Sequence, residues 1–358
     1  MNDRHPSSAV LVRGALGISL FIVVYATLLP FAGWRVPETL VWEGVVRPYQ
    51  TELDLVLNVA AYVPVGLLLA ALLLQSAGRH PLVKATALAS VLSLTLECLQ
   101  LFLPGRVTAL HDWLANSAGG LAGAAIAVSA QGQRIGARLA ALRARWLAAD
   151  NHAEWGALLL IVWLVAQSNP AVPFFEAGQL ANELTRDWQA ADPGVLAILP
   201  QVIAIALNVC GFALFLAVWV HPRIFAGVPA LLALAAGLMV KFLAAGLMLK
   251  APLLETWLGP ASALGLIAGY FLALVLLGAR PRTQLFLATL LIFGGGLMAR
   301  MAGTYDGFDG MLSLFERSHP QLGAFAGLTR WLNELWPVAA FLYLVILFVR
   351  GHASSVKS

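Results

Sequence analysis

The stretch LECLQLFLPGRVTALHDWLANSAGGLAG, residues 96–123, places polar side chains inside two apolar helices joined by a short turn. Two carboxylates at this turn, Glu97 and Asp112, could act as acid and base, or could orient a polar headgroup. The guanidinium of Arg106 suits a phosphate or a carboxylate, because its planar fork matches both. The stretch also holds the amides of Gln100 and Asn116.

Helical spacing collects these residues into stripes, because side chains three and four residues apart share one helical face. On the helix expected over 82–103 the stripe is Ser90, Ser93, Glu97 and Gln100. On the helix expected over 108–129 it is Asp112, Asn116, Gly120 and Gly123. On the helix expected over 55–75 it is Asp54, Asn58 and Tyr62. All three stripes lie at helix ends expected on one side of the membrane, so we expect them to converge.

Glu97 is expected to lie about 10 Å below the turn, where a charge costs up to ~2.5–3.5 kcal/mol on insertion scales. It should therefore face protein or water, with Arg106 as its nearest candidate partner in sequence. One interpretation is a structural clasp, in which interhelical hydrogen bonds contribute about 0.6 kcal/mol each and Gly119 and Gly123 allow close packing. A clasp does not require three carboxylates and an arginine, so we favour a functional site.

The pattern resembles the VanZ-like family of membrane proteins, named for an accessory factor of glycopeptide (teicoplanin) resistance. The first motif lies in DLVLNVAAYVPVGLLLA, with Asp54, Asn58, Pro64 and Gly66. The second motif comprises Glu97, Gln100, Pro104, Arg106, Asp112, Asn116, Gly119 and Gly123. The resemblance covers about residues 13–130 and departs at Asn58, where some members have His. It implies a role in the cell envelope and in antibiotic resistance, but no established chemistry.

Composition predicts an all-α, polytopic transmembrane helical bundle, since 60% of the residues are hydrophobic and 11% are charged. Runs of about 20 apolar residues can cross a bilayer, and we expect about ten transmembrane helices: 13–32, 55–75, 82–103, 108–129, 155–170, 197–219, 225–248, 259–279, 284–302 and 335–349. Lys and Arg concentrate in alternate segments, above all in a basic loop at 131–147. The positive-inside rule then places both termini in the cytoplasm, and the polar stripes at the outer side of the bacterial inner (plasma) membrane.

Three parts are expected along the chain. Residues 1–147 would form a four-helix VanZ-like transmembrane domain, and residues 148–282 a second four-helix half. Residues 283–358 would form a two-helix segment with an extracytoplasmic loop at 303–334. The second half partly echoes the first, as IALNVCGFALFLA at 205–217 echoes LVLNVAAYVPVGLLLA at 55–70. A degenerate internal repeat and chance similarity of Leu/Ala/Gly-rich helices both explain this echo.

Three functions remain open at this stage, and whether the protein is an enzyme is undecided. In the first, Glu97, Asp112 and Arg106 are catalytic and Asp54, Asn58, Gln100 and Asn116 bind a membrane lipid or a lipid-linked or amphipathic envelope molecule. The second is a proton-coupled transporter, and the third is a non-catalytic envelope-assembly scaffold. We expect no cofactor, no metal and no nucleic-acid partner; protein partners are not readable. Lys241, inside the seventh span, is expected to snorkel to the interface.

Overall fold

The computed structural model describes residues 8–36, 52–76, 78–103, 106, 108–147, 151–169, 199–221, 225–248, 260–301 and 320–351. Within these ranges the regular structure is α-helical and contains no strand, as an all-α membrane protein requires. The chain divides into two compact units. The first comprises Met1–Ala144 and His319–Leu328, and the second Arg145–Ser318 and Thr329–Ser358.

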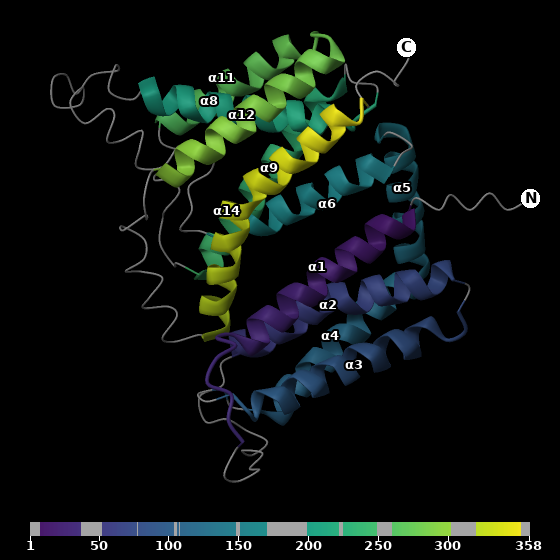
Figure 1. Cartoon of the computed structure of the whole chain (residues 1–358). Helices are drawn as coiled ribbons and strands as arrows, with labels where there is room; N and C mark the ends of the chain where they lie inside the picture. Colours follow the sequence, from purple (N-terminus) through teal and green to yellow (C-terminus); the bar gives the residue numbers. More distant parts are fainter. Residues whose placement is uncertain are drawn as a thin grey trace, which may run out of the picture. The chain divides into compact units, whose positions relative to one another are not determined.

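The first unit is built on four helices (Figure 1): α1 (Ser8–Leu28), α2 (Glu52–Gln75), α3 (Pro81–Gln100) and α4 (Leu110–Val128). Helix α2 packs against each of the other three, and its most extensive contact is with α4. The core between α1, α2 and α3 is apolar and is formed by Val23, Leu28, Tyr62, Val65, Ala89, Leu96 and Leu103. A fifth helix, α5 (Ala130–Trp146), follows α4 in the chain, and the boundary between the two units falls after its residue Ala144.

Glycines bring the backbones of α2 and α4 into direct contact. A Cβ at Gly119 would overlap the carbonyl oxygen of Val59, and a Cβ at Gly123 would overlap that of Val63. A Cβ at Gly66, on the other helix, would overlap the carbonyl of Gly120. Small residues permit this kind of approach between membrane helices, where packing replaces the hydrophobic effect as the attraction. The register of α4 along α2 is therefore fixed by main-chain contact.

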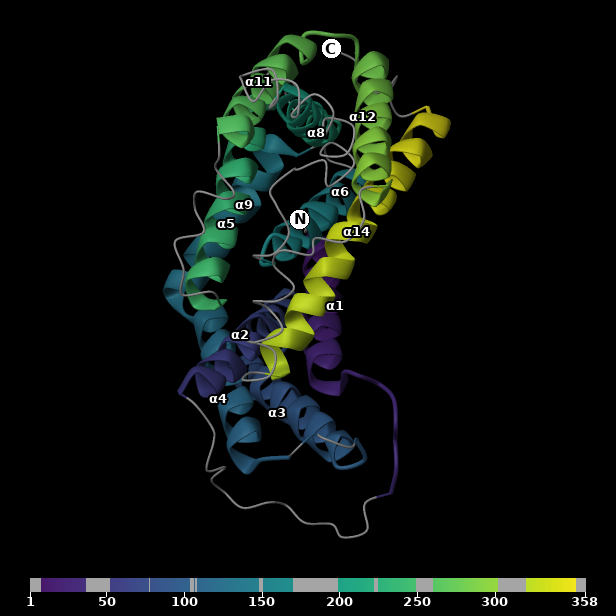
Figure 2. The ribbon, with the colours of Figure 1, turned by 90° about the vertical axis from the view of Figure 1, so that its left-hand side faces the viewer.

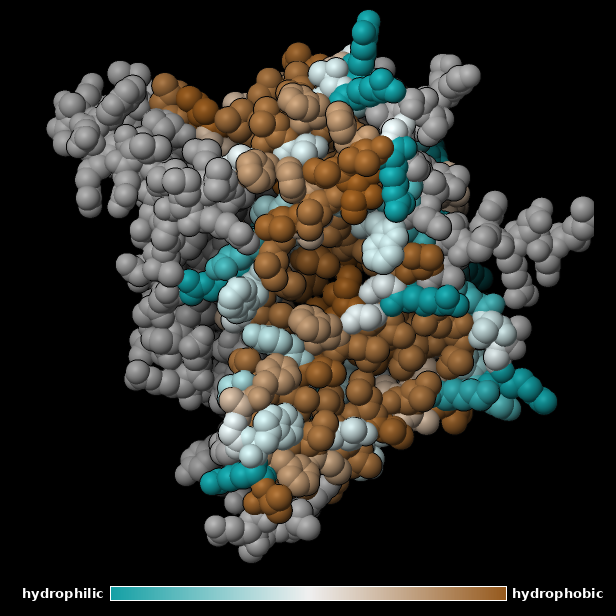
Figure 3. All heavy atoms as spheres, viewed as in Figure 1, coloured by the Kyte–Doolittle hydropathy of each residue, from teal (hydrophilic) through white to brown (hydrophobic). Residues whose placement is uncertain are grey.

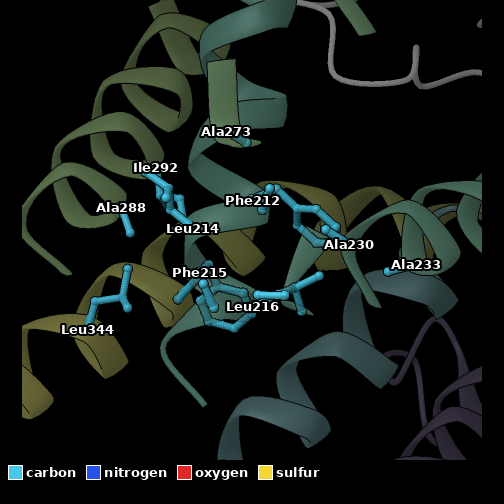
Figure 4. Packing of buried hydrophobic residues seen from close by; sticks show 14 of the residues in the cluster. Phe212, Leu214, Phe215, Leu216, Ala230, Ala233, Ala273, Ala288, Ile292 and Leu344 are labelled. Carbon is cyan, nitrogen blue, oxygen red and sulfur yellow. The ribbon is translucent and has the colours of Figure 1, made fainter. Parts of the chain in front are cut away.

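The second unit contains α6 (Asn151–Ala166), α8 (Leu199–Ala217), α9 (Gly227–Met248), α11 (Pro260–Leu276), α12 (Pro281–Met301) and most of α14 (Pro320–Val349). Helix α8 is its centre, and Phe212, Leu214 and Phe215 are almost completely buried (Figure 4). Here too a glycine helix meets another backbone, since a Cβ at Gly269 of α11 would overlap the Ala206 carbonyl of α8. The pairs α2–α4 and α8–α11 thus both pack through glycine against a backbone carbonyl.

Five described helical segments are long and apolar enough to cross a membrane: Val10–Leu28, Asp54–Gln75, Pro81–Gln100, Gly227–Gly246 and Phe325–Val349. A sixth span results if α4 and α5, which meet at a bend of 68°, count as one. Three other apolar helices are shorter, at His152–Ala166, Val202–Ala217 and Ser262–Leu276. Large apolar side chains are exposed along these helices, and hydrophobic residues cover much of the face in Figure 3. The chain is a helical membrane protein, although the predicted count of ten spans is not confirmed.

Three local expectations are wrong. The segment expected to be a basic loop at 131–147 is helical through residue 146, because Ser129 caps a new helix directly after α4. The loop expected at 303–334 is helical from Pro320, since α14 is longer than its predicted span. Lys241 does not snorkel: its side chain is 1% exposed and its Nζ donates to the carbonyl of Asn169 at 2.9 Å.

Close α2–α4 packing generates the first prediction. Gly123→Ala should lower the melting temperature of the purified protein, because the new methyl group overlaps the Val63 carbonyl, and overpacking costs about 1–3 kcal/mol. The matched control is Gly17→Ala on α1, where nothing lies within 4 Å of the new Cβ. That change should be neutral or stabilising, because alanine is the better helix former. Equal melting temperatures for the two variants would contradict the backbone contact.

Candidate functional site

The predicted stripes on α2 and α4 meet near the beginnings of both helices. The Nδ2 of Asn58 donates to the Oδ1 of Asp112 at 2.8 Å, and both side chains are buried. The same glycine contacts that set the register of α4 along α2 put these two residues opposite one another. Asp54 lies one helical turn before Asn58 and is half-buried, closer to the start of α2.

Glu97 meets α4 at its first turn. Its Oε2 accepts a hydrogen bond from the backbone N–H of Ala109 at 3.4 Å, and its side chain is 3% exposed. Ala109 is the N-cap residue of α4 and has no side chain able to cap the helix. A helix N-terminus favours a negative charge, because its first N–H groups have no partner within the helix. The Glu97 carboxylate of α3 therefore takes the place of a side-chain cap.

Arg106 and Gln100 donate hydrogen bonds to carbonyls at the C-terminus of α1. Arg106 donates from Nη2 to the carbonyls of Ala26 at 3.3 Å and Leu29 at 2.8 Å, and from Nε to Leu29 at 3.1 Å. Gln100 donates from Nε2 to the Thr27 carbonyl at 3.0 Å.

Proline explains why α1 needs these donors. Pro30 has no N–H to give to the carbonyl of Ala26 four residues earlier, and the Phe31 N–H bonds to Leu28 rather than to Thr27. The last carbonyls of a helix need partners where water is absent. Arg106 and Gln100 supply those partners and fasten the end of α1 to the α3–α4 turn.

A second polar layer lies one helical turn deeper between α3 and α4. The Nδ2 of Asn116 donates to Ser93 Oγ at 3.0 Å, and both side chains are buried. The Oδ1 of Asn116 is buried and has no hydrogen-bond partner among the described residues. An unmatched amide oxygen in a buried layer is costly, so this atom is a candidate contact for a molecule that enters the seam between α2, α3 and α4.

A third group of hydrogen bonds joins Trp113 and Ser117 of α4 to Ser90 of α3. The indole Nε1 of Trp113 donates to the carbonyl of Ser90 at 3.2 Å and to its Oγ at 3.1 Å. Ser117 donates to the same Oγ at 2.9 Å. These bonds are made by indole and hydroxyl groups, without a charged side chain. A structural clasp between α3 and α4 therefore explains them fully.

The structure therefore places all seven predicted site residues at one end of α1–α4, although in separate layers. Asn58 and Asp112 are in direct contact, Glu97 caps α4, Arg106 and Gln100 cap α1, Asn116 lies deeper, and Asp54 lies toward the start of α2. Sequence reasoning missed the partners of Arg106 and Gln100, because these are backbone carbonyls that no side-chain pattern reports. Trp113 and Ser117 could have been found, since they share a helical face with one another.

Chemically, the seam joins carboxylates, amides and a guanidinium at the end of an apolar bundle. Such groups can bind a polar headgroup or move a proton, provided that a molecule reaches them. Among the described residues, no group of three or more His, Cys, Asp or Glu side chains is placed to hold a metal ion.

Comparison with known proteins finds one match, to a family model. The VanZ/LLP1 family model matches residues 10–131, which run from α1 to the start of α5 and contain every residue of the seam. No curated protein and no solved structure matches the chain. The family match confirms the resemblance seen in the motifs, and residues 10–131 of this membrane protein are a VanZ-like domain.

Proposed function

We propose that the seam between α2, α3 and α4 is a functional site for a lipid-linked or amphipathic molecule of the bacterial cell envelope. The site faces the extracytoplasmic side of the inner membrane, and both termini are cytoplasmic. Glu97 and Asp112 are its acid and base, or orient a polar headgroup. Arg106 lies at its rim and takes a phosphate or carboxylate, while Asp54, Asn58, Gln100 and Asn116 bind the rest of the polar part.

One observation carries this proposal: Glu97 and Asp112 are both buried in one seam with an unmatched amide oxygen at Asn116. Buried carboxylates within a membrane domain are expensive and mark functional positions more often than structural ones. The Oε2 of Glu97 accepts the capping bond from Ala109, but an amide or hydroxyl would cap α4 at a lower desolvation cost. The use of carboxylates therefore favours a role for their charge or their proton.

The distribution of polarity favours a lipid headgroup over a transported solute. The opposite ends of α2 and α4 are apolar, with GLLLAALLLQ at 66–75 and LAGAAIAV at 121–128. A proton-coupled transporter needs polar groups near the bilayer midplane and a path to both sides. A molecule that stays in one leaflet, with its apolar part in lipid, needs polar groups at one end only.

A non-catalytic assembly scaffold is the second candidate, and the helix-end caps favour it. Arg106 and Gln100 make well-defined bonds to α1, and Asn58 is already bonded to Asp112. If these bonds are the whole purpose of the seam, the charge of Glu97 is dispensable while its hydrogen bond is not.

Glu97→Gln separates the two candidates. The glutamine oxygen can still accept from the Ala109 N–H, and a neutral amide is cheaper to bury, so the melting temperature should hold or rise. A site that uses the charge or proton of Glu97 should nevertheless lose its activity in cells. The measurement pairs membrane abundance and melting temperature with envelope-antibiotic sensitivity of a null strain complemented by the variant.

The matched control is Glu52→Gln, which removes an exposed carboxylate from the first turn of α2, outside the seam. It should leave both abundance and sensitivity unchanged. Full complementation by Glu97→Gln at normal abundance would exclude a functional charge at that position. If Glu97→Gln is unstable, Asp112→Asn replaces it, because an asparagine can still pair with Asn58.

The proposed orientation has its own test. Alkaline phosphatase fused after Arg145 should be inactive, because the basic segment that ends there is expected in the cytoplasm. The same enzyme fused after Asp187, which lies outside the described residues, should be active. The reverse pattern would place the seam at the cytoplasmic side and would exclude an outer-leaflet substrate.

A further inference from the structure

Helix α5 is an amphipathic, basic helix that no part of the seam uses. Its sequence, AQGQRIGARLAALRARW, contains four arginines and no Asp or Glu. No residue of the helix is buried. Four arginines between residues 134 and 145 exclude α5 from the hydrocarbon core, because each costs ~2.5–3.5 kcal/mol at its centre.

The apolar side chains of α5 form one narrow face. Ile135, Leu139 and Leu142 are spaced by four and three residues, and their side chains are 47%, 61% and 51% exposed. Arg134 and Arg138, also exposed, follow one flank of this face at the same spacing, one residue ahead of Ile135 and Leu139. Small residues, Gly136, Ala140 and Ala144, occupy the opposite side.

The bend between α4 and α5 is fixed by local hydrogen bonds. Ser129 has an extended backbone, and its Oγ accepts from the N–H of Gly132 at 2.9 Å, the bond of an N-cap to the third helical residue. The same Oγ donates to the Ile126 carbonyl at the end of α4 at 2.7 Å, and Gln133 Nε2 donates to Val128 at 2.9 Å. Helix α5 therefore leaves α4 at 68° rather than continuing along it (Figure 2).

We propose that α5 lies in the headgroup region of the membrane, with Ile135, Leu139 and Leu142 among the acyl chains and its arginines on anionic phospholipid headgroups. A helix set at a steep angle to a membrane-packed helix runs along the bilayer surface. An exposed apolar face flanked by arginines fits that surface, since the arginine stems reach outward to phosphates while the leucines enter lipid. The absence of acidic residues in α5 makes the attraction specific for anionic lipids.

This inference is independent of the function proposed for the seam. The arginines of this segment also support the proposed membrane orientation, but the positive-inside rule depends on their charges alone. That rule requires no helix, no Ser129 cap and no apolar face beside the arginines, whereas the proposed contact with the membrane surface depends on all three.

The test uses full-length protein in nanodiscs of phosphatidylcholine with or without phosphatidylglycerol, where both faces are accessible and insertion topology has no influence. Exposed Cys98 is changed to Ala, buried Cys210 remains, and a spin label is placed at Leu139→Cys or Ala140→Cys. In anionic discs the label at 139 should be reached by oxygen and shielded from a water-soluble nickel chelate, and the label at 140 should show the reverse. The protein without an added cysteine gives the background from Cys210.

The charge requirement is measured with the label at 139 in mixed discs that carry the relaxing nitroxide on phosphatidylglycerol or on phosphatidylcholine. The preference for phosphatidylglycerol should fall by about fivefold for each arginine removed in Arg134→Gln/Arg138→Gln, the factor that corresponds to about 1 kcal/mol per basic residue. The matched control, Arg280→Gln/Arg282→Gln, removes two exposed arginines elsewhere and should leave the preference unchanged.

Three results would overturn the proposal. Chelate access at 139 in anionic discs would place the apolar face in water. Shielding at 139 from both oxygen and chelate would mean that protein, either a second copy or another partner, covers the face. Equal relaxation by the two labelled lipids would remove the preference for anionic headgroups.

Discussion

Backbone contact between α2 and α4 is the constraint on which the rest of the VanZ-like domain depends. With Gly66, Gly119 and Gly123 at the crossing, the register of the two helices cannot slide without a clash between main chains. That register puts Asn58 opposite Asp112. It also sets the height at which the first turn of α4 meets Glu97 of α3. The membrane interior holds no water that could pair with a misaligned polar group. The polar contacts therefore depend on the register that the glycines set.

The charged groups of the domain have two physical tasks that need not conflict. Arg106 satisfies the Ala26 carbonyl that Pro30 leaves open at the end of α1, Gln100 satisfies the neighbouring Thr27 carbonyl, and the Glu97 carboxylate meets the N-terminus of α4. Each charge thus lies beside a helix end of opposite polarity, which reduces the cost of burial. A carboxylate positioned in this way is also held in one place, as a catalytic or binding group must be.

Sequence periodicity predicted much of this arrangement, for reasons that mark its limits. Steps of three and four residues gave the helix faces, and with them the meeting of Asn58 with Asp112, because side-chain spacing reports helical geometry directly. The partners of Arg106 were beyond such reasoning, since the Ala26 and Leu29 carbonyls have no sequence signature. Helix α5 was predicted as a loop because its arginines were used for topology, while the helical spacing of Ile135, Leu139 and Leu142 was not considered. Lys241 was misjudged because its partner, the Asn169 carbonyl, is again backbone.

The central claim is that the seam receives a molecule rather than only holding helices together. The most direct measurement is an experimental density map of the full-length protein, extracted with its native lipids into nanodiscs. The account predicts non-protein density at the α2–α3–α4 seam, with a polar end within hydrogen-bonding distance of Asp112 or the Oδ1 of Asn116 and an apolar end in the bilayer. A closed seam in which Asn116 finds a protein or water partner, with no such density beside Glu97 or Asp112, would contradict it.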